Sequence, residues 1–149
     1  MYTDPRVVDF VKHNFVPVRA HVKDDKDAFK KLGDRFDAHW TPTTLVVDSN
    51  GTERHRIEGF LPVDDFLSQL ALGAAKAAFA RQDYATAERL YREVVEKYPS
   101  TDAAPEAQYW TGVSRYRVTS DAGALKETAT AFSNRYQESS WAKKASVWQ

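Results

Sequence analysis

The chain has 149 residues, 42% of them hydrophobic, and its 21 Lys and Arg residues balance its 21 Asp and Glu residues. This length and composition predict a globular protein of one domain or two small ones. Zero net charge argues against a basic groove for nucleic acid. The absence of cysteine excludes disulfides, thiolate catalysis and zinc–thiolate sites within these residues.

No feature of the sequence points to a membrane. No apolar run reaches the ~20 residues that a membrane helix needs. The N-terminal residues MYTDPRVVDF lack the basic and apolar regions of a signal peptide. We therefore expect a cytoplasmic protein with no membrane partner.

Three elements are predicted ahead of residue 40. A helix begins at Pro5, which follows an acidic N-cap residue, and ends near Asn14. Residues 15–22, FVPVRAHV, alternate apolar and other side chains and predict a β-strand. Pro17 has no N–H group and favours an edge or unpaired position in that strand. A second helix, opened by paired aspartates, is predicted over residues 26–36 because its apolar residues recur at helical spacing.

The stretch from residue 40 to residue 62 predicts a β-hairpin. Residues 44–47 form a short β-branched run, residues 48–51, DSNG, form a turn, and residues 53–59 alternate with a period of about two. Pro42 stands just ahead of the first strand, where an X-Pro bond can be cis.

Three parts of this stretch resemble the second half of a thioredoxin-like domain: Thr41-Pro42-Thr43, the turn at residues 48–51, and residues 56–60, RIEGF. The resemblance covers about residues 2–72. In that family the proline is cis and its loop faces a CxxC motif on an earlier strand–helix unit. The resemblance implies a partial βαββα unit whose CxxC segment would lie ahead of Met1.

The strand that would carry the CxxC motif is central in the family's sheet, and unpaired buried backbone is costly. Three alternatives follow. The two remaining strand segments pair directly, or a second copy of the chain fills the vacant position in a homodimer, or the gene product begins upstream of Met1.

The rest of the chain is rich in alanine and predicts helices over residues 63–81 and 84–98, separated by a turn at Gln82 and Asp83. Small residues facing aromatic ones, closed by a proline, resemble the tetratricopeptide repeat, a helix pair of about 34 residues. Gln82 stands where that repeat usually has glycine. The positions that carry the resemblance are Ala75, Ala78, Tyr84, Ala87, Tyr91 and Pro99.

A second helix pair is predicted from Pro105 to Tyr116 and from Leu125 to Tyr136, with a last helix over residues 141–149 that could cap the stack. The repeated pattern is similar to divergent tetratricopeptide arrays of bacterial envelope-assembly proteins. The expected fold is therefore α/β plus all-helical. It comprises a partial thioredoxin-like domain over residues 1–72 and helical repeats over residues 73–149, with the helix at about 63–81 shared.

The candidate binding residues lie in two stretches. In thioredoxin-like proteins the cis-proline loop offers backbone groups to an extended segment, so Trp40 either grips a peptide or packs on its own domain. Aromatic residues of the repeats either line a groove or hold the helix pairs together. The candidate partner-binding residues are His39, Trp40, Thr41, Pro42, Thr43, Tyr109, Trp110, Arg115 and Tyr116.

No catalytic, cofactor-binding or metal-binding residue is predicted. The paired aspartates at residues 24–25 and 64–65 begin helices, where capping accounts for them. No Gly-rich phosphate loop is present, and the histidines match no metal motif. The sequence thus predicts a redox-inactive, non-catalytic module that binds a protein or peptide partner. The alternative is a fragment of a thiol–disulfide oxidoreductase whose CxxC motif lies upstream of Met1.

Overall fold

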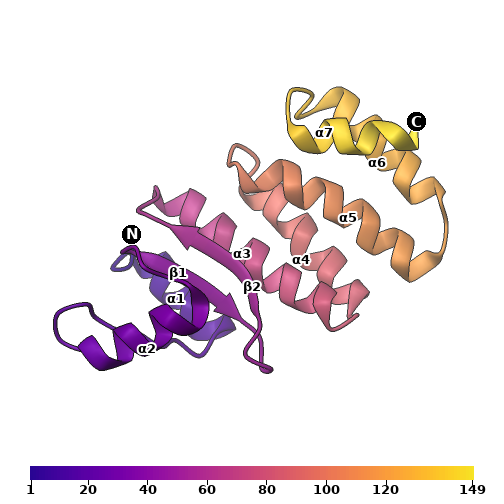
Figure 1. Cartoon of the computed structure of the whole chain (residues 1–149). Coiled ribbons are helices and arrows are strands. Elements are labelled where there is room, and N and C mark those ends of the chain that lie inside the picture. The colour runs from indigo at the N-terminus through magenta and orange to yellow at the C-terminus, as the bar shows by residue number, and fades with distance from the viewer. The chain divides into compact units, whose positions relative to one another are not determined.

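The computed structural model describes all residues, Met1–Gln149, and divides into two compact units, Met1–Val63 and Asp64–Gln149. None of its helices combines the length and apolar character needed to cross a bilayer. In chain order the elements are α1 (Pro5–Asn14), α2 (Lys26–Phe36), β1 (Thr43–Val47), β2 (Glu53–Glu58), α3 (Val63–Ala80), α4 (Tyr84–Lys97), α5 (Ala103–Thr119), α6 (Gly123–Asn134), α7 (Ser140–Ala145) and a 3-10 turn (Ser146–Trp148), as Figure 1 shows.

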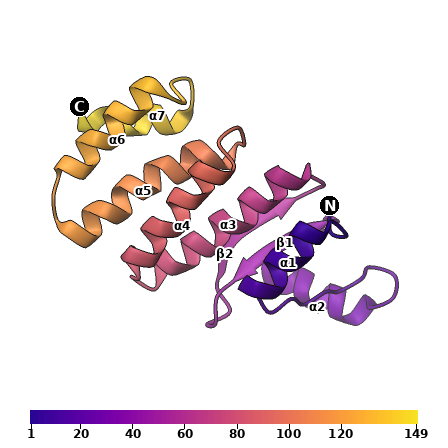
Figure 2. The ribbon, with the colours of Figure 1, turned by 180° about the vertical axis from the view of Figure 1, so that it is seen from behind.

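Helix α1 confirms its predicted start and end. The Asp4 side chain accepts a hydrogen bond of 2.9 Å from the Arg6 N–H, and proline occupies the first helical position. Seen from the front in Figure 1 and from behind in Figure 2, α1 lies across one face of the hairpin. Its Val7 is 2% exposed, and a hydrogen bond of 3.0 Å joins the hydroxyls of Tyr2 and Thr44. The amphipathic helix therefore covers the hairpin with its apolar face.

The predicted strand over residues 15–22 is wrong. These residues form no ladder with any part of the chain, and the only sheet consists of β1 and β2. Alternation of apolar side chains produces a strand only where a neighbouring strand accepts and donates the main-chain hydrogen bonds. No such neighbour lies beside residues 15–22, and Pro17 withholds one of the donors.

Helix α2 has the predicted bounds, but its aspartates do not both cap it. Asp25 occupies the N-cap position and makes no cap hydrogen bond, because its carboxylate accepts from the His21 N–H at 3.1 Å. At the other end, the N–H of Ala38 donates to Gly33 O at 2.9 Å. A Cβ at position 33 would lie 2.9 Å from Ala38 O. Glycine there allows the chain to turn sharply out of α2.

Strands β1 and β2 confirm the predicted hairpin. They pair antiparallel, with Thr44 opposite Ile57 and Leu45 opposite Arg56, and a register shift follows Val46. In the turn, Gly51 has φ +79°, a left-handed conformation that favours glycine. Val46 and Ile57 are each 5% exposed and form the buried face of the hairpin.

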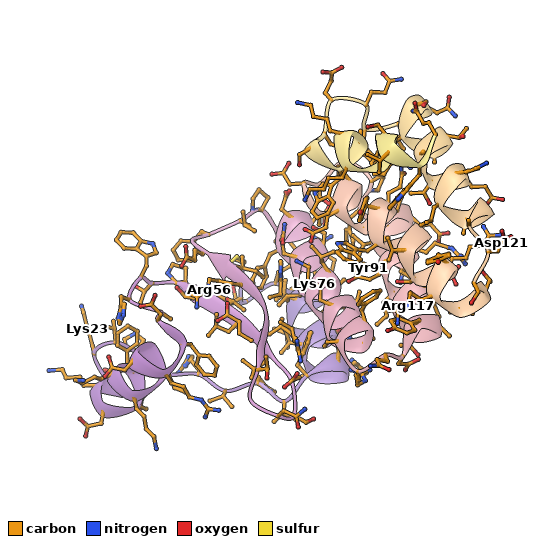
Figure 3. The ribbon with its side chains drawn as sticks, turned by 45° about the vertical axis from the view of Figure 1, so that its right-hand side comes forward. Lys23, Arg56, Lys76, Tyr91, Arg117 and Asp121 are labelled. Atoms are coloured by element: carbon orange, nitrogen blue, oxygen red, sulfur yellow. The ribbon has the colours of Figure 1, made fainter.

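The second unit is built on antiparallel helices with a shared apolar core. Small residues of α3, α4 and α5 allow close approach of the helices, and Tyr91 fills the space between them (Figure 3). Lys76 on α3 and Glu106 on α5 form an ion pair of 2.9 Å. The fully buried members of this core are Leu72, Ala75, Ala78, Ala87, Tyr91, Val94, Ala103 and Ala107.

The turn at Gln82 lies where the sequence predicts it, whereas the bounds of two later helices differ from the prediction. Gln82 has φ +64°, the conformation that usually selects glycine at this point. Helix α5 begins at Ala103, two residues before Pro105, since proline is tolerated throughout a first helical turn. The last predicted helix is broken, because α7 ends at Ala145 and a 3-10 turn follows.

Candidate functional site

The loop between α2 and β1 carries four of the candidate residues, the fifth, Thr43, begins β1, and hydrogen bonds fix the end of the loop nearest β1. The Thr41–Pro42 peptide bond is cis. The Thr43 hydroxyl donates to the carbonyl of Trp40 at 2.7 Å. The N–H of Gly59 donates to the carbonyl of Pro42 at 2.8 Å, which extends the pairing of the hairpin by one residue. The loop backbone is thus continuous with β1.

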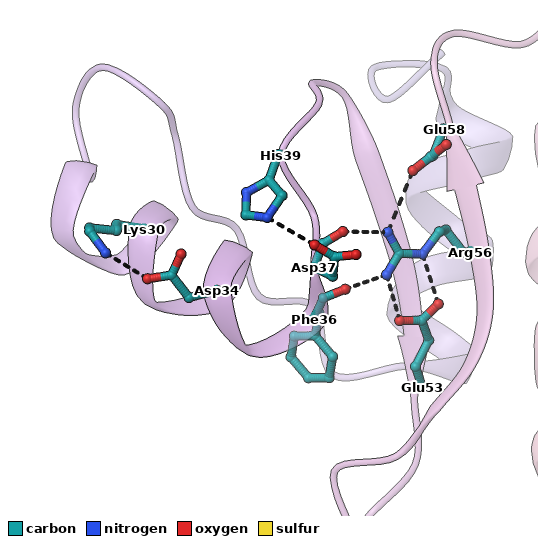
Figure 4. Close-up of polar contacts among 8 residues, drawn as sticks. All are labelled: Lys30, Asp34, Phe36, Asp37, His39, Glu53, Arg56 and Glu58. Carbon is teal, nitrogen blue, oxygen red and sulfur yellow. Dashed lines mark hydrogen bonds and ion pairs between the residues drawn. The ribbon is translucent and has the colours of Figure 1, made fainter.

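Arg56 on β2 fixes the other end of the loop, as Figure 4 shows. Its guanidinium donates to both carboxylate oxygens of Glu53 at 2.8 Å and to the carbonyl of Asp37 at 3.1 Å. It also donates to the carbonyl of Phe36, and Glu58 lies 3.5 Å from its Nη1. One planar fork therefore joins the hairpin to the last turn of α2.

The charges of the hairpin are locked by these contacts. The Arg56 guanidinium lowers the pKa of Glu53, and the two carboxylates beside Arg56 raise the pKa of Arg56 in turn. At the turn, the Thr52 N–H and the Arg54 guanidinium lower the pKa of Asp48. The lowered pKa values keep Glu53 and Asp48 charged at neutral pH, so ion pairs with Arg56 and Arg54 hold the hairpin.

Two large apolar side chains are exposed at the same end of the hairpin. Trp40 is 68% exposed and Phe60 is 74% exposed. Because Pro42 pairs with Gly59, the residues just outside that pair lie at one end of the sheet. His39 also points outward, and its Nε2 lies 3.0 Å from an oxygen of Asp37. Trp40 and Phe60 are therefore exposed together at this end of the hairpin, and Phe60 is not among the residues predicted to bind a partner.

The four candidates on α5 have different surroundings. The Tyr109 ring stacks on Trp148 with centroids 4.8 Å apart and lies 5.2 Å from the ring of Trp141. Trp110 lies 5.1 Å from the ring of Phe79. These aromatic rings bind helices of their own unit together, which is the packing alternative for the repeat aromatics.

Arg115 and Tyr116 lie apart from these rings. Arg115 forms an ion pair of 2.7 Å with Glu127 on α6, and Tyr116 is 37% exposed. The structure therefore does not bring the candidates together. Five lie in the first unit, and of the four on α5 only Tyr109 and Trp110 belong to the aromatic cluster, while Arg115 and Tyr116 lie further along the helix.

A hollow between α4, α5 and α6 was not anticipated from the sequence. Its volume is about 350 Å³, and its wall includes Arg92, Gln108, Arg115 and Glu127. The side-chain nitrogen of Gln108 is buried and has no hydrogen-bond partner. The helical spacing of residues 108, 111, 112 and 115 places them on one side of α5, but only the packing of three helices makes this side concave.

The chain has no group of three or more His, Cys, Asp or Glu side chains close enough to hold a metal ion. The candidate residues of the loop are an indole, an imidazole, two hydroxyls and a proline ring, with no nucleophile held by a base. The loop can offer an apolar contact and main-chain hydrogen bonds, which are the means by which proteins bind extended peptides.

Comparison with known proteins supports the N-terminal assignment. Residues 1–74 match the family model of the thioredoxin-like domain. A thioredoxin-like domain is therefore present in the N-terminal part of the chain. Searches of curated proteins and of solved structures gave no match. The family match ends before α4, so the tetratricopeptide assignment of the helical part stays a prediction.

Proposed function

We propose that the chain is a non-catalytic module for protein–protein interaction, and that its thioredoxin-like domain binds an extended partner segment at residues 39–43. The observation that carries this proposal is the exposure of Trp40, 68%, beside a loop whose two ends are hydrogen-bonded to the domain. An exposed aromatic residue on a fixed loop gives a partner apolar contact at little cost in conformational entropy.

Phe60 supports the same surface. Its exposure of 74% at the same end of the hairpin extends the apolar contact beyond a single ring. Single exposed apolar residues are common on protein surfaces, but two large ones at one end of a two-stranded sheet favour a binding function. We infer that a bound segment places apolar side chains against Trp40 and Phe60 and main-chain groups along the loop.

The helical part supplies a second partner surface in this proposal. The small-residue and aromatic core of α3, α4 and α5 supports assignment to tetratricopeptide-like repeats, which bind proteins on extended surfaces. Because Tyr109 and Trp110 stack within their own unit, we assign contact with a partner to Tyr116 and Arg115 instead.

A library of displayed random peptides, selected on the intact chain, tests the main proposal. We expect enriched peptides to lose at least about tenfold in affinity, about 1.4 kcal/mol, for the Trp40→Ala and Phe60→Ala variants. The matched control is Val147→Ala, since Val147 is 78% exposed but lies in the last turn of the chain. If the selected peptides bind the Trp40→Ala variant as tightly as the wild-type chain, this site is refuted.

The thioredoxin-like match also favours a second candidate, a thiol–disulfide oxidoreductase role in a longer product. The residues given contain no cysteine, so this role needs a CxxC motif from an upstream segment. Translation of the DNA upstream of Met1, together with mass spectrometry of the protein from its source, decides between the two candidates. An in-frame CxxC in the mature protein supports the second.

A further inference from the structure

One edge of the hairpin has main-chain groups with no neighbouring strand. The sheet contains β1 and β2 only. The Gly59 N–H donates to Pro42 O, so residue 42 lies at a hydrogen-bonded position facing β2. In antiparallel pairs such positions alternate along the strand, and Thr44 and Val46 are therefore the next two. The N–H and C=O groups of Thr43 and Leu45 consequently point to the outer edge of β1.

The two edges of this sheet differ in charge. Strand β2, ERHRIE, carries two glutamates and two arginines, and charged side chains on an edge strand oppose pairing with another chain. Strand β1, TTLVV, has no charged residue at all. The outer edge of β1 therefore lacks the protection that the outer edge of β2 has.

The same unit contains a second unpaired segment, residues 15–22. Val16 is 92% exposed and Val18 is 81% exposed, and the segment forms no ladder. In an extended segment the main-chain groups of residues 16, 18 and 20 point to one side, and those of residues 17, 19 and 21 point to the other. The second side has no donor to offer at Pro17, and the His21 N–H already donates to Asp25. The segment can therefore pair with another strand only through the main-chain groups of residues 16, 18 and 20.

We propose that two copies of the chain associate by reciprocal strand addition, in which residues 16–20 of one copy pair with the outer edge of β1 in the other copy. The chain contains both halves of this contact, the uncharged strand β1 and the unpaired residues 16–20, and within one copy the two are not paired. Reciprocal use of both halves closes a twofold dimer and leaves no edge of β1 open.

The burial of the first unit favours a second copy as the occupant. Only three of its apolar residues, Val7, Val46 and Ile57, are buried. A two-stranded sheet is marginal alone; α1 packs on one face of this sheet, and a third strand would add main-chain hydrogen bonds along the open edge of β1. Strand addition covers Val16 and Val18, the most exposed valines of the chain, while each sheet gains its third strand.

A pair of proline substitutions tests the direction of pairing. Ala20→Pro removes an N–H group on the pairing side, and Arg19→Pro, one residue earlier, removes one on the open side. We expect the wild-type chain to be a dimer by light scattering over a micromolar to millimolar concentration series. Ala20→Pro should weaken dimerisation by at least about tenfold, and Arg19→Pro should leave it unchanged.

A charge substitution gives a second test that does not depend on proline. Val18→Lys places a charge on the donor segment, and Val147→Lys is the matched control at a similarly exposed valine. Circular dichroism verifies the fold of each variant. We expect the Val18→Lys variant to be a monomer and the Val147→Lys variant to remain a dimer. Amide exchange at Leu45 should be faster in the Val18→Lys variant than in the wild-type chain.

Three outcomes would overturn the proposal. The first is a wild-type chain that is monomeric at every concentration. The second is a dimer that withstands both Ala20→Pro and Val18→Lys, or one in which the Leu45 amide exchanges as fast as in the monomer. The third is a longer, N-terminally extended chain that is monomeric with its Leu45 amide protected, because its own upstream segment then covers the edge of β1.

Discussion

Arg56 and Glu53 form a two-contact ion pair on one strand, with both N–O distances at 2.8 Å. The same guanidinium reaches the main-chain carbonyls of Phe36 and Asp37, which end helix α2. Glu53 therefore orients a group whose other N–H bonds fix the entrance to the candidate loop. The position of the loop at its α2 end therefore depends on this pair.

Arg56→Lys should loosen the loop. A lysine ammonium cannot reproduce the planar fork that serves one carboxylate and two carbonyls together. We expect the midpoint of thermal unfolding to fall by several degrees and amide exchange at residues 38–41 to accelerate. The matched control is Arg54→Lys, since Arg54 makes a single contact of 2.7 Å with Asp48 that lysine can replace. Equal effects of the two substitutions would contradict the role of the fork.

Acid should destabilise the hairpin turn through Asp48. The Thr52 N–H and Arg54 hold its pKa below the ordinary value of 3.8. A carboxylate whose pKa is lowered by folding stabilises the fold above its unfolded pKa, and this stability is lost as pH falls through the folded pKa. Asp48→Asn keeps the acceptor for the N–H groups but removes the charge. The free energy of unfolding should then fall less steeply below about pH 5.

Urea unfolding at a series of pH values measures this slope. Glu138→Gln serves as the control, because Glu138 is exposed and has no ion pair. If the slope of Asp48→Asn matches that of the control and of the wild-type chain, the charge of Asp48 does not stabilise the turn.

The elements that local residues determine were predictable from the sequence. Helix α1 follows from an acid and a proline at its first positions, and the hairpin follows from a turn that tolerates positive φ. The failed strand at residues 15–22 has the same apolar alternation as a real strand, but strand formation needs a neighbour elsewhere in the fold. No local pattern reports whether that neighbour exists.

The candidate site was predictable in part for a similar reason. Thr41-Pro42-Thr43 and Trp40 are recognisable as a motif, and the thioredoxin-like match includes them. The reach of Arg56 to carbonyls 19 and 20 residues away, and the buried nitrogen of Gln108, depend on how helices pack. The sequence of β2, ERHRIE, contains two arginines and does not indicate which of them contacts α2.

Gln82→Gly should stabilise the helical unit. Gln82 has φ +64° between α3 and α4, where a residue with a Cβ is strained by roughly 1–2 kcal/mol. Glycine removes this strain, offset by its larger entropy in the unfolded chain, so we expect a gain of about 0.5–1 kcal/mol in the free energy of unfolding. Arg81→Gly is the control with the opposite sign, since the Arg81 N–H still bonds within the helix, to Ala77 O. A loss of stability in Gln82→Gly, measured by urea unfolding, would contradict this account.

Gly112→Ala should destabilise the same unit. Helices α5 and α6 approach so closely at this point that a Cβ on residue 112 would overlap the Thr128 side chain. Overpacking of this kind costs about 1–3 kcal/mol, whereas alanine in place of an exposed helical glycine stabilises by up to about 1 kcal/mol. A decrease in the free energy of unfolding would thus indicate that residues 112 and 128 are in contact, and an increase would indicate that they are not.

Thr128→Ala in the Gly112→Ala background completes the test. Removal of the Thr128 hydroxyl and methyl groups relieves part of the overlap, since the Cβ of residue 128 stays 2.7 Å from a Cβ at residue 112, and it also removes the hydrogen bond of 2.8 Å to Ala124 O. The double variant should therefore be more stable than the sum of the two single changes predicts. Additive effects in the urea-unfolding cycle would show that residues 112 and 128 do not meet, and that α5 and α6 pack at a greater distance.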